Sequence, residues 1–160
     1  MGSQARRGTI MTRRVLVIFG IGVAVLLGVT VGTHRALAHK AKHTPEQLKL
    51  FDELFMEQVR TGDLLFHGDA DTEKKMGVTL SKTGVACAMC HPFASDTHPY
   101  EFPKFQVSMD KFGTLRDMIN WCIEKPQEGV RIDSDSDAMK ALESYIYWSN
   151  RGSVLDPGRH

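Results

Sequence analysis

One five-residue motif constrains this 160-residue chain more than any other feature: Cys87-Ala-Met-Cys90-His91, which has the spacing C-x-x-C-H. Two thiols one helical turn apart reach the two vinyl groups of one porphyrin, and the residue that follows presents an imidazole to the iron. The motif therefore predicts one covalently attached haem c. Cys87 and Cys90 would form the thioether bonds, and His91 would be the proximal iron ligand.

Other uses of paired cysteines fit this sequence less well. A structural zinc site needs a second pair of Cys or His ligands, and Cys122 is the one further cysteine in the chain. A thiol–disulfide redox site is expected within a βαβ pattern, which the sequence does not contain. Three cysteines are also an odd number and too few for a disulfide framework. Haem attachment is the interpretation that remains.

The N-terminus has the organisation of an export signal. Residues 15–31 are an apolar run, preceded by Arg13-Arg14 and followed by Ala36-Leu37-Ala38. A positively charged start, an apolar segment and an A-x-A site are typical of a secretory signal peptide. The run is also close to the length of a membrane-spanning helix, so cleavage after Ala38 and retention as a membrane anchor both remain open. We expect residues 1–38 to direct export and residues 39–160 to function in the periplasm.

The charge balance differs between these two segments. The chain has 20 Lys and Arg against 19 Asp and Glu, and residues 1–38 hold five of the arginines and no acid. Residues 39–160 therefore have 15 basic and 19 acidic side chains, a formal charge of −4. A nucleic-acid-binding domain would present a basic face, so we expect no nucleic-acid partner. The negative charge favours redox proteins with basic patches as partners.

Two helices are predicted before the motif. Thr44-Pro45 is a helix start, and apolar residues recur at helical spacing until Gly62 ends the run. A short second helix is expected at residues 64–66. Residues 68–84 are polar and contain several glycines, so we predict a loop that leads to the motif. Residues 92–113 contain three prolines and show no periodicity. They are predicted to form an irregular loop that wraps around the site.

Two further helices are predicted after residue 113. Thr114 caps the first, with Asp117 at the third position, and Pro126 ends it. The second follows an acidic turn at residues 133–137 and ends at Gly152. Four helical segments and no convincing strand define an all-α class. We therefore expect a single-haem, all-α domain that follows an N-terminal hydrophobic helix.

The motif leaves the sixth iron ligand open. The candidates after the motif are His98, Met109, Met118, Cys122 and Met139. Met109 lies in the wrapping loop, where many small haem proteins present a methionine, although a thioether packed among aromatic side chains is an equal alternative. Cys122 lies on the apolar face of a predicted helix, where a buried inert thiol is the default. The remaining methionines are expected in the core, and His98 is expected in solvent.

The chain resembles the class I cytochromes c, and its C-terminal part resembles one group of them. The matching pieces are Phe102-Pro103-Lys104-Phe105, residues 114–122, residues 135–142, Tyr145-Ile146 and Arg151-Gly152. These pieces are similar to the haem domains of thiosulfate dehydrogenase and of the cytochrome subunit of the sulfur-oxidation complex. The resemblance implies that Cys122 ligates the iron and takes part in sulfur chemistry.

Two features depart from the pattern of those enzymes. Met118 stands four residues before Cys122, where the family has an arginine, and the chain has a single C-x-x-C-H motif, whereas those enzymes pass electrons to a further haem. We therefore expect an exported monohaem c-type cytochrome that carries single electrons between redox partners, rather than an enzyme. The alternative is a haem-cysteine enzyme, or a subunit of one, that oxidises thiosulfate-type sulfur compounds. The aromatic residues expected to wall the haem are Phe105, Trp121, Tyr145 and Trp148.

Overall fold

The computed structural model describes residues 43–159 of the chain. The predicted apolar run at residues 15–31 and the cleavage site after Ala38 lie outside these residues. Within the described part, no helix combines the length and the apolar character needed to cross a membrane.

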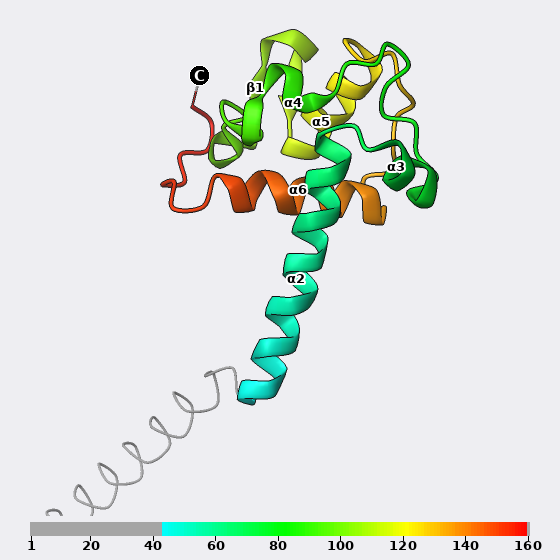
Figure 1. Cartoon of the computed structure of the whole chain (residues 1–160). Coiled ribbons are helices and arrows are strands. Elements are labelled where there is room, and N and C mark those ends of the chain that lie inside the picture. Colours follow the sequence, from blue (N-terminus) through cyan, green and yellow to red (C-terminus); the bar gives the residue numbers. More distant parts are fainter. Residues whose placement is uncertain (1–42, 160) are drawn as a thin grey trace, which may run out of the picture. The chain divides into compact units, whose positions relative to one another are not determined.

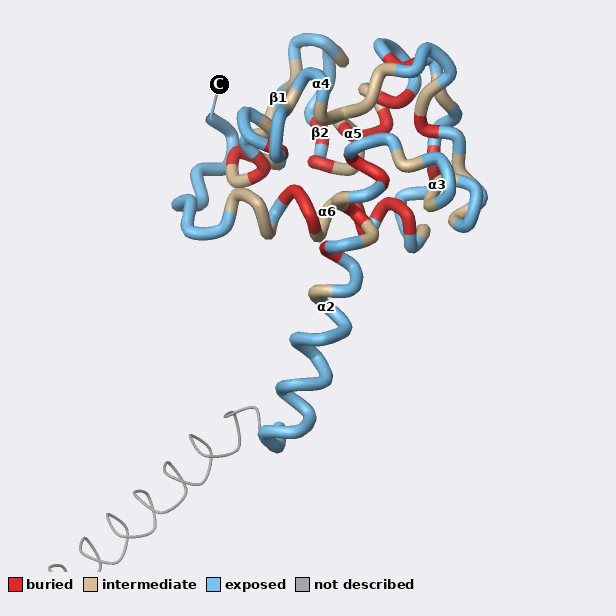
Figure 2. Tube along the Cα trace, in the orientation of Figure 1, coloured by how far each residue is buried: buried red, intermediate tan, exposed pale blue. Residues whose placement is uncertain are grey.

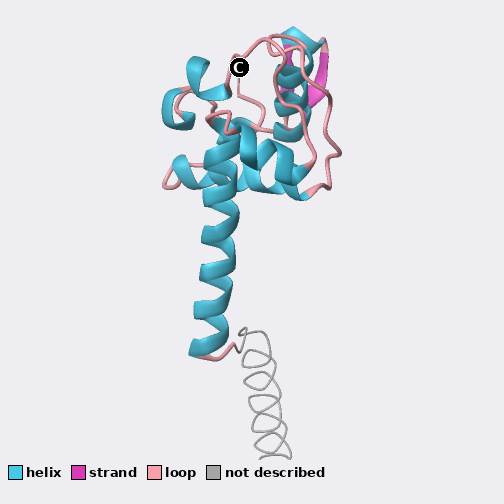
Figure 3. Cartoon of the chain, turned by 45° about the vertical axis from the view of Figure 1, so that its right-hand side comes forward, coloured by secondary structure: helices cyan, strands magenta, loops and turns pink. Residues whose placement is uncertain are grey.

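The described chain is mainly helical, as the all-α prediction requires, and it also contains one small hairpin (Figures 1 and 3). Its α-helices are α2 (Pro45–Phe66), α3 (Ala70–Met76), α4 (Cys87–Cys90), α5 (Leu115–Glu124) and α6 (Asp137–Ser149). Its 3-10 helices are η1 (Pro92–Ala94), η2 (Pro99–Glu101) and η3 (Val107–Met109). Its strands are β1 (Lys104–Gln106) and β2 (Lys111–Gly113).

Helix α2 is continuous, although the sequence predicted an end at Gly62 and a second helix at residues 64–66. That prediction is wrong because Gly62 lies at a close crossing with α6. A Cβ atom at Gly62 would overlap with the carbonyl oxygen of Ala141 and would lie 2.8 Å from Cβ of Tyr145. Glycine therefore allows close packing here and does not end the helix. The buried residues of α2 are all in its C-terminal part: Val59, Gly62, Leu65 and Phe66 (Figure 2).

Helix α3 lies in the segment that the sequence predicted as a loop, residues 68–84. The side chain of Asp69 caps it by accepting a hydrogen bond of 2.8 Å from the backbone N–H of Thr72. Gly77 ends it in the left-handed conformation, with φ 66°. Asp and Gly are common residues for these two positions. Because α3 has no buried residue, apolar periodicity could not reveal it.

An antiparallel hairpin lies within the predicted irregular loop, so the expectation of no strand is wrong in this detail. Strands β1 and β2 pair with Phe105 opposite Phe112. Each strand has three residues, too few to show an alternating pattern. Helix η3 joins them and carries Met109, which packs on the hairpin. A Cβ atom at Gly113 would lie 2.7 Å from Cε of Met109.

Helices α5 and α6 form where the sequence predicted them. Thr114 and Asp117 make a capping box, in which each side chain accepts a hydrogen bond from the backbone N–H of the other residue. Ser136 caps α6 by accepting a hydrogen bond of 3.2 Å from the backbone N–H of Met139. These two helices and the end of α2 supply most of the core. Its larger members are Val59, Leu65, Phe66, Leu80, Leu115, Ile119, Ile123, Ile132, Met139, Leu142, Tyr145 and Ile146.

Candidate haem site

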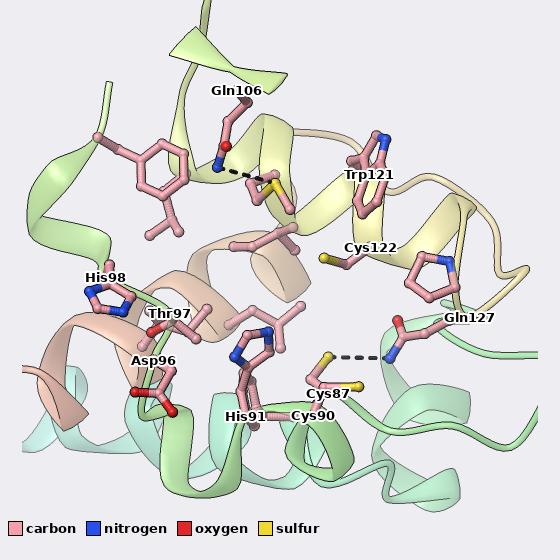
Figure 4. Close-up of a pocket in the computed structure, with 18 of the residues that line it drawn as sticks. Cys87, Cys90, His91, Asp96, Thr97, His98, Gln106, Trp121, Cys122 and Gln127 are labelled. Carbon is pink, nitrogen blue, oxygen red and sulfur yellow. Dashed lines mark hydrogen bonds between the residues drawn. The ribbon is translucent and has the colours of Figure 1, made fainter. Parts of the chain in front are cut away.

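The C-x-x-C-H motif forms a single helical turn, α4, which faces a cavity. The backbone N–H of His91 donates a hydrogen bond of 2.9 Å to the carbonyl oxygen of Cys87 and closes the turn. His91 itself has left the helical conformation, with φ −127° and ψ 72°. Its imidazole and the thiol of Cys87 both point into the cavity (Figure 4). The local fold therefore presents the attachment and ligand groups on one wall.

The cavity encloses about 350 Å³ and has a mainly apolar lining. Helix α4 and the residues before it form one wall, and α5 forms the wall that faces it (Figure 4). The ends of α2 and α6 complete it. Its apolar side chains include Phe66, Val85, Phe102, Leu115, Ile119, Trp121, Leu142 and Ile146. Such a lining suits the flat faces of a porphyrin.

The four site residues predicted from the sequence line this one cavity: Cys87, Cys90, His91 and Cys122. Cys122 lies on α5, and its thiol points toward the space above Cys87 (Figure 4). The fold therefore brings a third sulfur, 35 positions after Cys87 in the chain, to the side of the cavity that faces the motif.

Three other sixth-ligand candidates take different places. Met109, the alternative ligand, is not among the residues that line the cavity and packs on the hairpin at Gly113. Met139 is fully buried in the core, as expected. His98 is exposed, as expected, and it also lies at the edge of the cavity.

Met118 lines the cavity one helical turn before Cys122. Residues four apart share a face of a helix, so the two sulfur-bearing side chains lie on the same side of α5. The side-chain amide of Gln106 donates a hydrogen bond of 3.5 Å to Sδ of Met118 (Figure 4). This contact holds the Met118 thioether toward the hairpin.

The aromatic wall of the cavity differs from the expectation. Trp121 lines the cavity as predicted. Tyr145 and Trp148 line a separate surface depression, and Phe105 is exposed on the hairpin. In their place, the cavity is lined by Phe66 from α2 and by Phe102. The sequence could not show which aromatic residues face the cavity, because aromatic residues occur both on the sides of these elements that face the cavity and on the sides that face away from it.

The polar atoms of the cavity fit a haem c. Nδ1 of His91 is buried and has no hydrogen-bond partner among the described residues. A histidine beside paired thiols is the usual proximal ligand of haem c. Cys87 and Cys90 lie on the same wall, where they would form the two thioether bonds. The residues present therefore fit the group that the motif predicts.

Burial raises the pKa of both thiols that face the cavity interior. For Cys87 the hydrogen bond of 3.4 Å from the side-chain amide of Gln127 partly opposes this rise in pKa. Burial raises the pKa of Cys122 to about 11. Without iron, the Cys122 thiol is therefore protonated at neutral pH, and a thiolate ligand would release this proton when it binds the metal.

Gln127 is a cavity residue that the sequence did not reveal. Its Nε2 donates hydrogen bonds to the carbonyl oxygen of Val85 at 3.0 Å and to Sγ of Cys87 at 3.4 Å. Its Oε1 is buried and has no partner among the described residues. No motif marks Gln127, because its partners lie 42 and 40 positions earlier in the chain.

A charged pair lies at the edge of the cavity. Glu101, which is 8% exposed, accepts a hydrogen bond of 2.6 Å from Nζ of Lys104. This hydrogen bond lowers the pKa of Glu101, and the charges of Lys104 and His98 act in the same direction. Lys104 and His98 both contribute to the lining of the cavity. The edge therefore carries an ion pair, in which the buried Glu101 carboxylate holds the Lys104 ammonium in place.

Small helical domains that present C-x-x-C-H to an apolar cavity are c-type cytochromes, and the described part of this chain has that organisation. A comparison with protein families agrees with this class. Residues 73–155, more than half of the chain, match the model of the SoxA/TsdA cytochrome c domain. The chain belongs to this family. A cytochrome c domain implies covalently bound haem c and electron transfer through it.

One curated relative is a thiosulfate dehydrogenase of Psychrobacter arcticus, to which the chain is 25% identical over 126 residues. The alignment covers 73% of this chain and 37% of that protein. The chain therefore spans little more than a third of the relative's length. The family match and this relative confirm the resemblance inferred from the sequence.

Proposed function

We propose that this protein is an exported monohaem c-type cytochrome that carries single electrons between redox protein partners. The observation that most supports it is the placement of Cys87, Cys90 and His91 on one wall of an apolar cavity. When bound, haem supplies a one-electron Fe(II)/Fe(III) couple. The single C-x-x-C-H motif supports one haem per chain.

The residues of the cavity have separate roles in this proposal. Cys87 and Cys90 would hold the cofactor covalently, and His91 would be the proximal ligand. Cys122, which faces them from α5, would be the second iron ligand. The apolar lining excludes water, so the charge of an axial thiolate acts strongly on the iron. A thiolate favours Fe(III) and lowers the reduction potential, whereas a neutral thioether raises it.

Export and choice of partner are proposed from the sequence. The arginines, apolar run and A-x-A site in residues 1–38 support export to the periplasm. If the segment is retained, residues 15–31 would anchor the protein to the membrane. The formal charge of −4 on residues 39–160 supports redox partners that present basic patches.

The proposal is tested by producing the full chain in a periplasm that can mature c-type cytochromes. We expect an intact mass that exceeds the polypeptide mass by one haem, and a low-spin haem spectrum that chemical reductant and oxidant interconvert. A mature protein without haem would contradict the proposal. Cell fractionation tests export, and N-terminal sequencing distinguishes cleavage after Ala38 from a retained anchor.

Oxidation of a sulfur compound is a second candidate function, and two observations favour it. Cys122 lines the cavity, and the relative from Psychrobacter arcticus is named a thiosulfate dehydrogenase. In this case the thiol of Cys122 would bind the sulfur substrate beside the iron. Reduction of the purified haem by thiosulfate, and loss of that reduction in Cys122→Ala, would favour the enzyme. A haem that partner proteins reduce but thiosulfate does not would favour the electron carrier.

A further inference from the structure

The segment that follows His91 folds into a tight reversal. It contains four residues other than glycine with a positive φ: Phe93 (55°), Ala94 (54°), Asp96 (59°) and His98 (45°). A side chain makes this backbone conformation costly, and such residues persist where the surrounding contacts fix them. Residues 96–98 line the same cavity as His91 (Figure 4). The conformation of this segment therefore shapes the wall beside the proximal ligand.

Ala94 is at the centre of the reversal. It is fully buried, and its backbone N–H donates a hydrogen bond of 3.0 Å to the carbonyl oxygen of His91. Its own carbonyl oxygen accepts two hydrogen bonds, one of 2.7 Å from Oγ1 of Thr97 and one of 3.0 Å from Nδ2 of Asn150. A short chain of hydrogen bonds therefore connects the backbone of His91 to the side chain of Asn150.

Asn150 lies at the C-terminal end of α6, 56 positions after Ala94. Its Nδ2 also lies 3.3 Å from Oγ1 of Thr97 and 2.9 Å from the carbonyl oxygen of Ile146. Carbonyl oxygens can only accept, so the end of the amide that faces Ala94 and Ile146 is the NH₂ group. Asn150 therefore ties the segment after the motif to α6, of which Leu142 and Ile146 line the cavity.

We propose that Asn150 is a positioning residue that holds His91 in the orientation it needs as the proximal iron ligand. This inference rests on the proposed function. Asn150 acts through Ala94, whose backbone N–H bonds to the His91 carbonyl oxygen. Without the Asn150 donor, the left-handed residues lose a contact that fixes them, and the backbone of His91 gains an alternative conformation. The imidazole then takes more than one orientation at the iron.

A second contact of Asn150 has to be separated from this role. Its bond to Ile146 lies within the last turn of α6, so Asn150→Ala also weakens the end of that helix. Thr97→Val removes the other donor to the Ala94 carbonyl oxygen and leaves α6 unchanged. Valine has nearly the same shape as threonine. The two variants therefore act on the same carbonyl oxygen from different elements.

The experiment compares holoproteins made from the full chain. The g values of a low-spin ferric haem in electron paramagnetic resonance depend on the orientation of its axial ligands, and hydrogen exchange of the Ala94 amide reports opening of the segment. We expect Asn150→Ala and Thr97→Val each to raise this exchange rate about fivefold, the effect of one lost hydrogen bond, and to add a second set of g values. Asn150→Asp, which has the same size but cannot donate when ionised, should do the same.

Ser136→Ala is the matched control. Ser136 caps the other end of α6 by accepting a hydrogen bond of 3.2 Å from the backbone N–H of Met139, so its loss weakens the same helix without touching the segment after His91. This variant should retain a single set of g values. A single set in Asn150→Ala, a wild-type exchange rate in Thr97→Val, or a second set in Ser136→Ala would overturn the role of Asn150. A wild-type chain without haem would overturn the proposed function, and the role of Asn150 with it.

Discussion

Gly62 of α2 lies directly against Ala141 of α6, and a side chain at position 62 would overlap with the Ala141 carbonyl oxygen. The two helices cross where the end of α2 enters the core and reaches the cavity through Phe66. The packing of the haem site therefore depends on the close approach of two helix backbones, at a residue without a side chain.

Gly62→Ala tests this crossing. Alanine is favoured over glycine in a helix by about 1 kcal/mol. The added methyl group has no space, because the backbone of Ala141 lies where it would be placed. Overpacking costs about 1–3 kcal/mol or more, so we expect a net loss of stability despite the better helix propensity. Urea unfolding of the purified holoprotein measures this change in the free energy of unfolding.

Thr61→Ala is the matched control, because it changes the neighbouring position of the same helix. It is expected to change the free energy of unfolding by less than about 1 kcal/mol. A Gly62→Ala protein that is more stable than wild type would show that the helices separate without loss of packing.

Local signals account for the parts of the fold that the sequence could predict. Thr114 and Asp117 marked the start of α5 because a capping box involves residues three apart. Gly62 was mistaken for a helix end because its partner, Ala141, is 79 positions away. Asp69 and Gly77 carried the capping signals of α3, but a helix without buried residues has no apolar period to support them.

Asn120 is a second residue whose importance lies in distant contacts. It is fully buried, and its side-chain amide donates to the carbonyl oxygen of Ile132 and accepts from its backbone N–H, both at 3.0 Å. Asn120→Ala leaves both backbone groups buried without a partner, which costs about 1–3 kcal/mol. We expect the free energy of unfolding, measured by thermal or urea denaturation, to fall by that amount. Gln58→Ala, on the exposed face of α2, should stay within about 0.5 kcal/mol of wild type.

The Glu101–Lys104 pair predicts a specific dependence of stability on pH. The pKa of Glu101 is lowered in the folded protein by the hydrogen bond from Lys104. Its contribution is therefore complete above the unfolded pKa of 4.5 and is lost as the pH falls through the lower folded pKa. Glu101→Gln should reduce stability by about 1–2 kcal/mol at pH 7 and by progressively less below pH 4.5.

The control variant for that experiment is Asp135→Asn, which removes an exposed carboxylate that forms an ion pair with Arg116. The Asp135 side chain is 91% exposed, so its loss should have little effect on stability at any pH. If the stability of Glu101→Gln differs from that of wild type by the same amount at pH 3 and at pH 7, the charge of the Glu101 carboxylate is not what stabilises the edge of the cavity.

The sequence located the attachment wall of the candidate site better than the opposite wall. Cys87, Cys90 and His91 lie within one turn, so their spacing alone was sufficient to predict that they face one cofactor. Met109 was an alternative ligand because many small haem proteins present a methionine from the wrapping loop. The hairpin that places Met109 away from the cavity has strands of three residues, which are too short to show a pattern in the sequence. Gln127 could not be found because its contacts depend on how the segment after α5 packs on the segment before α4.

The last prediction concerns the second axial ligand. Cys122 lies on α5 and points into the cavity, whereas Met109 packs against Gly113 and does not line the cavity. Met118 lines the cavity too, but its sulfur accepts a hydrogen bond from Gln106. We therefore expect Cys122→Ala to lose the native low-spin spectrum or to shift the reduction potential upward, since an anionic thiolate is lost.

Two methionine variants provide the comparison for Cys122→Ala. Met109→Ala and Met118→Leu should retain the native spectrum and potential, because neither removes an iron ligand. Electronic absorption and redox titration of the three holoproteins measure the outcome. If Met109→Ala or Met118→Leu abolishes the native spectrum while Cys122→Ala keeps it, Cys122 is a buried thiol with no bond to iron. Oxidation of sulfur compounds then loses its main support, because the Cys122 sulfur would no longer lie at the metal.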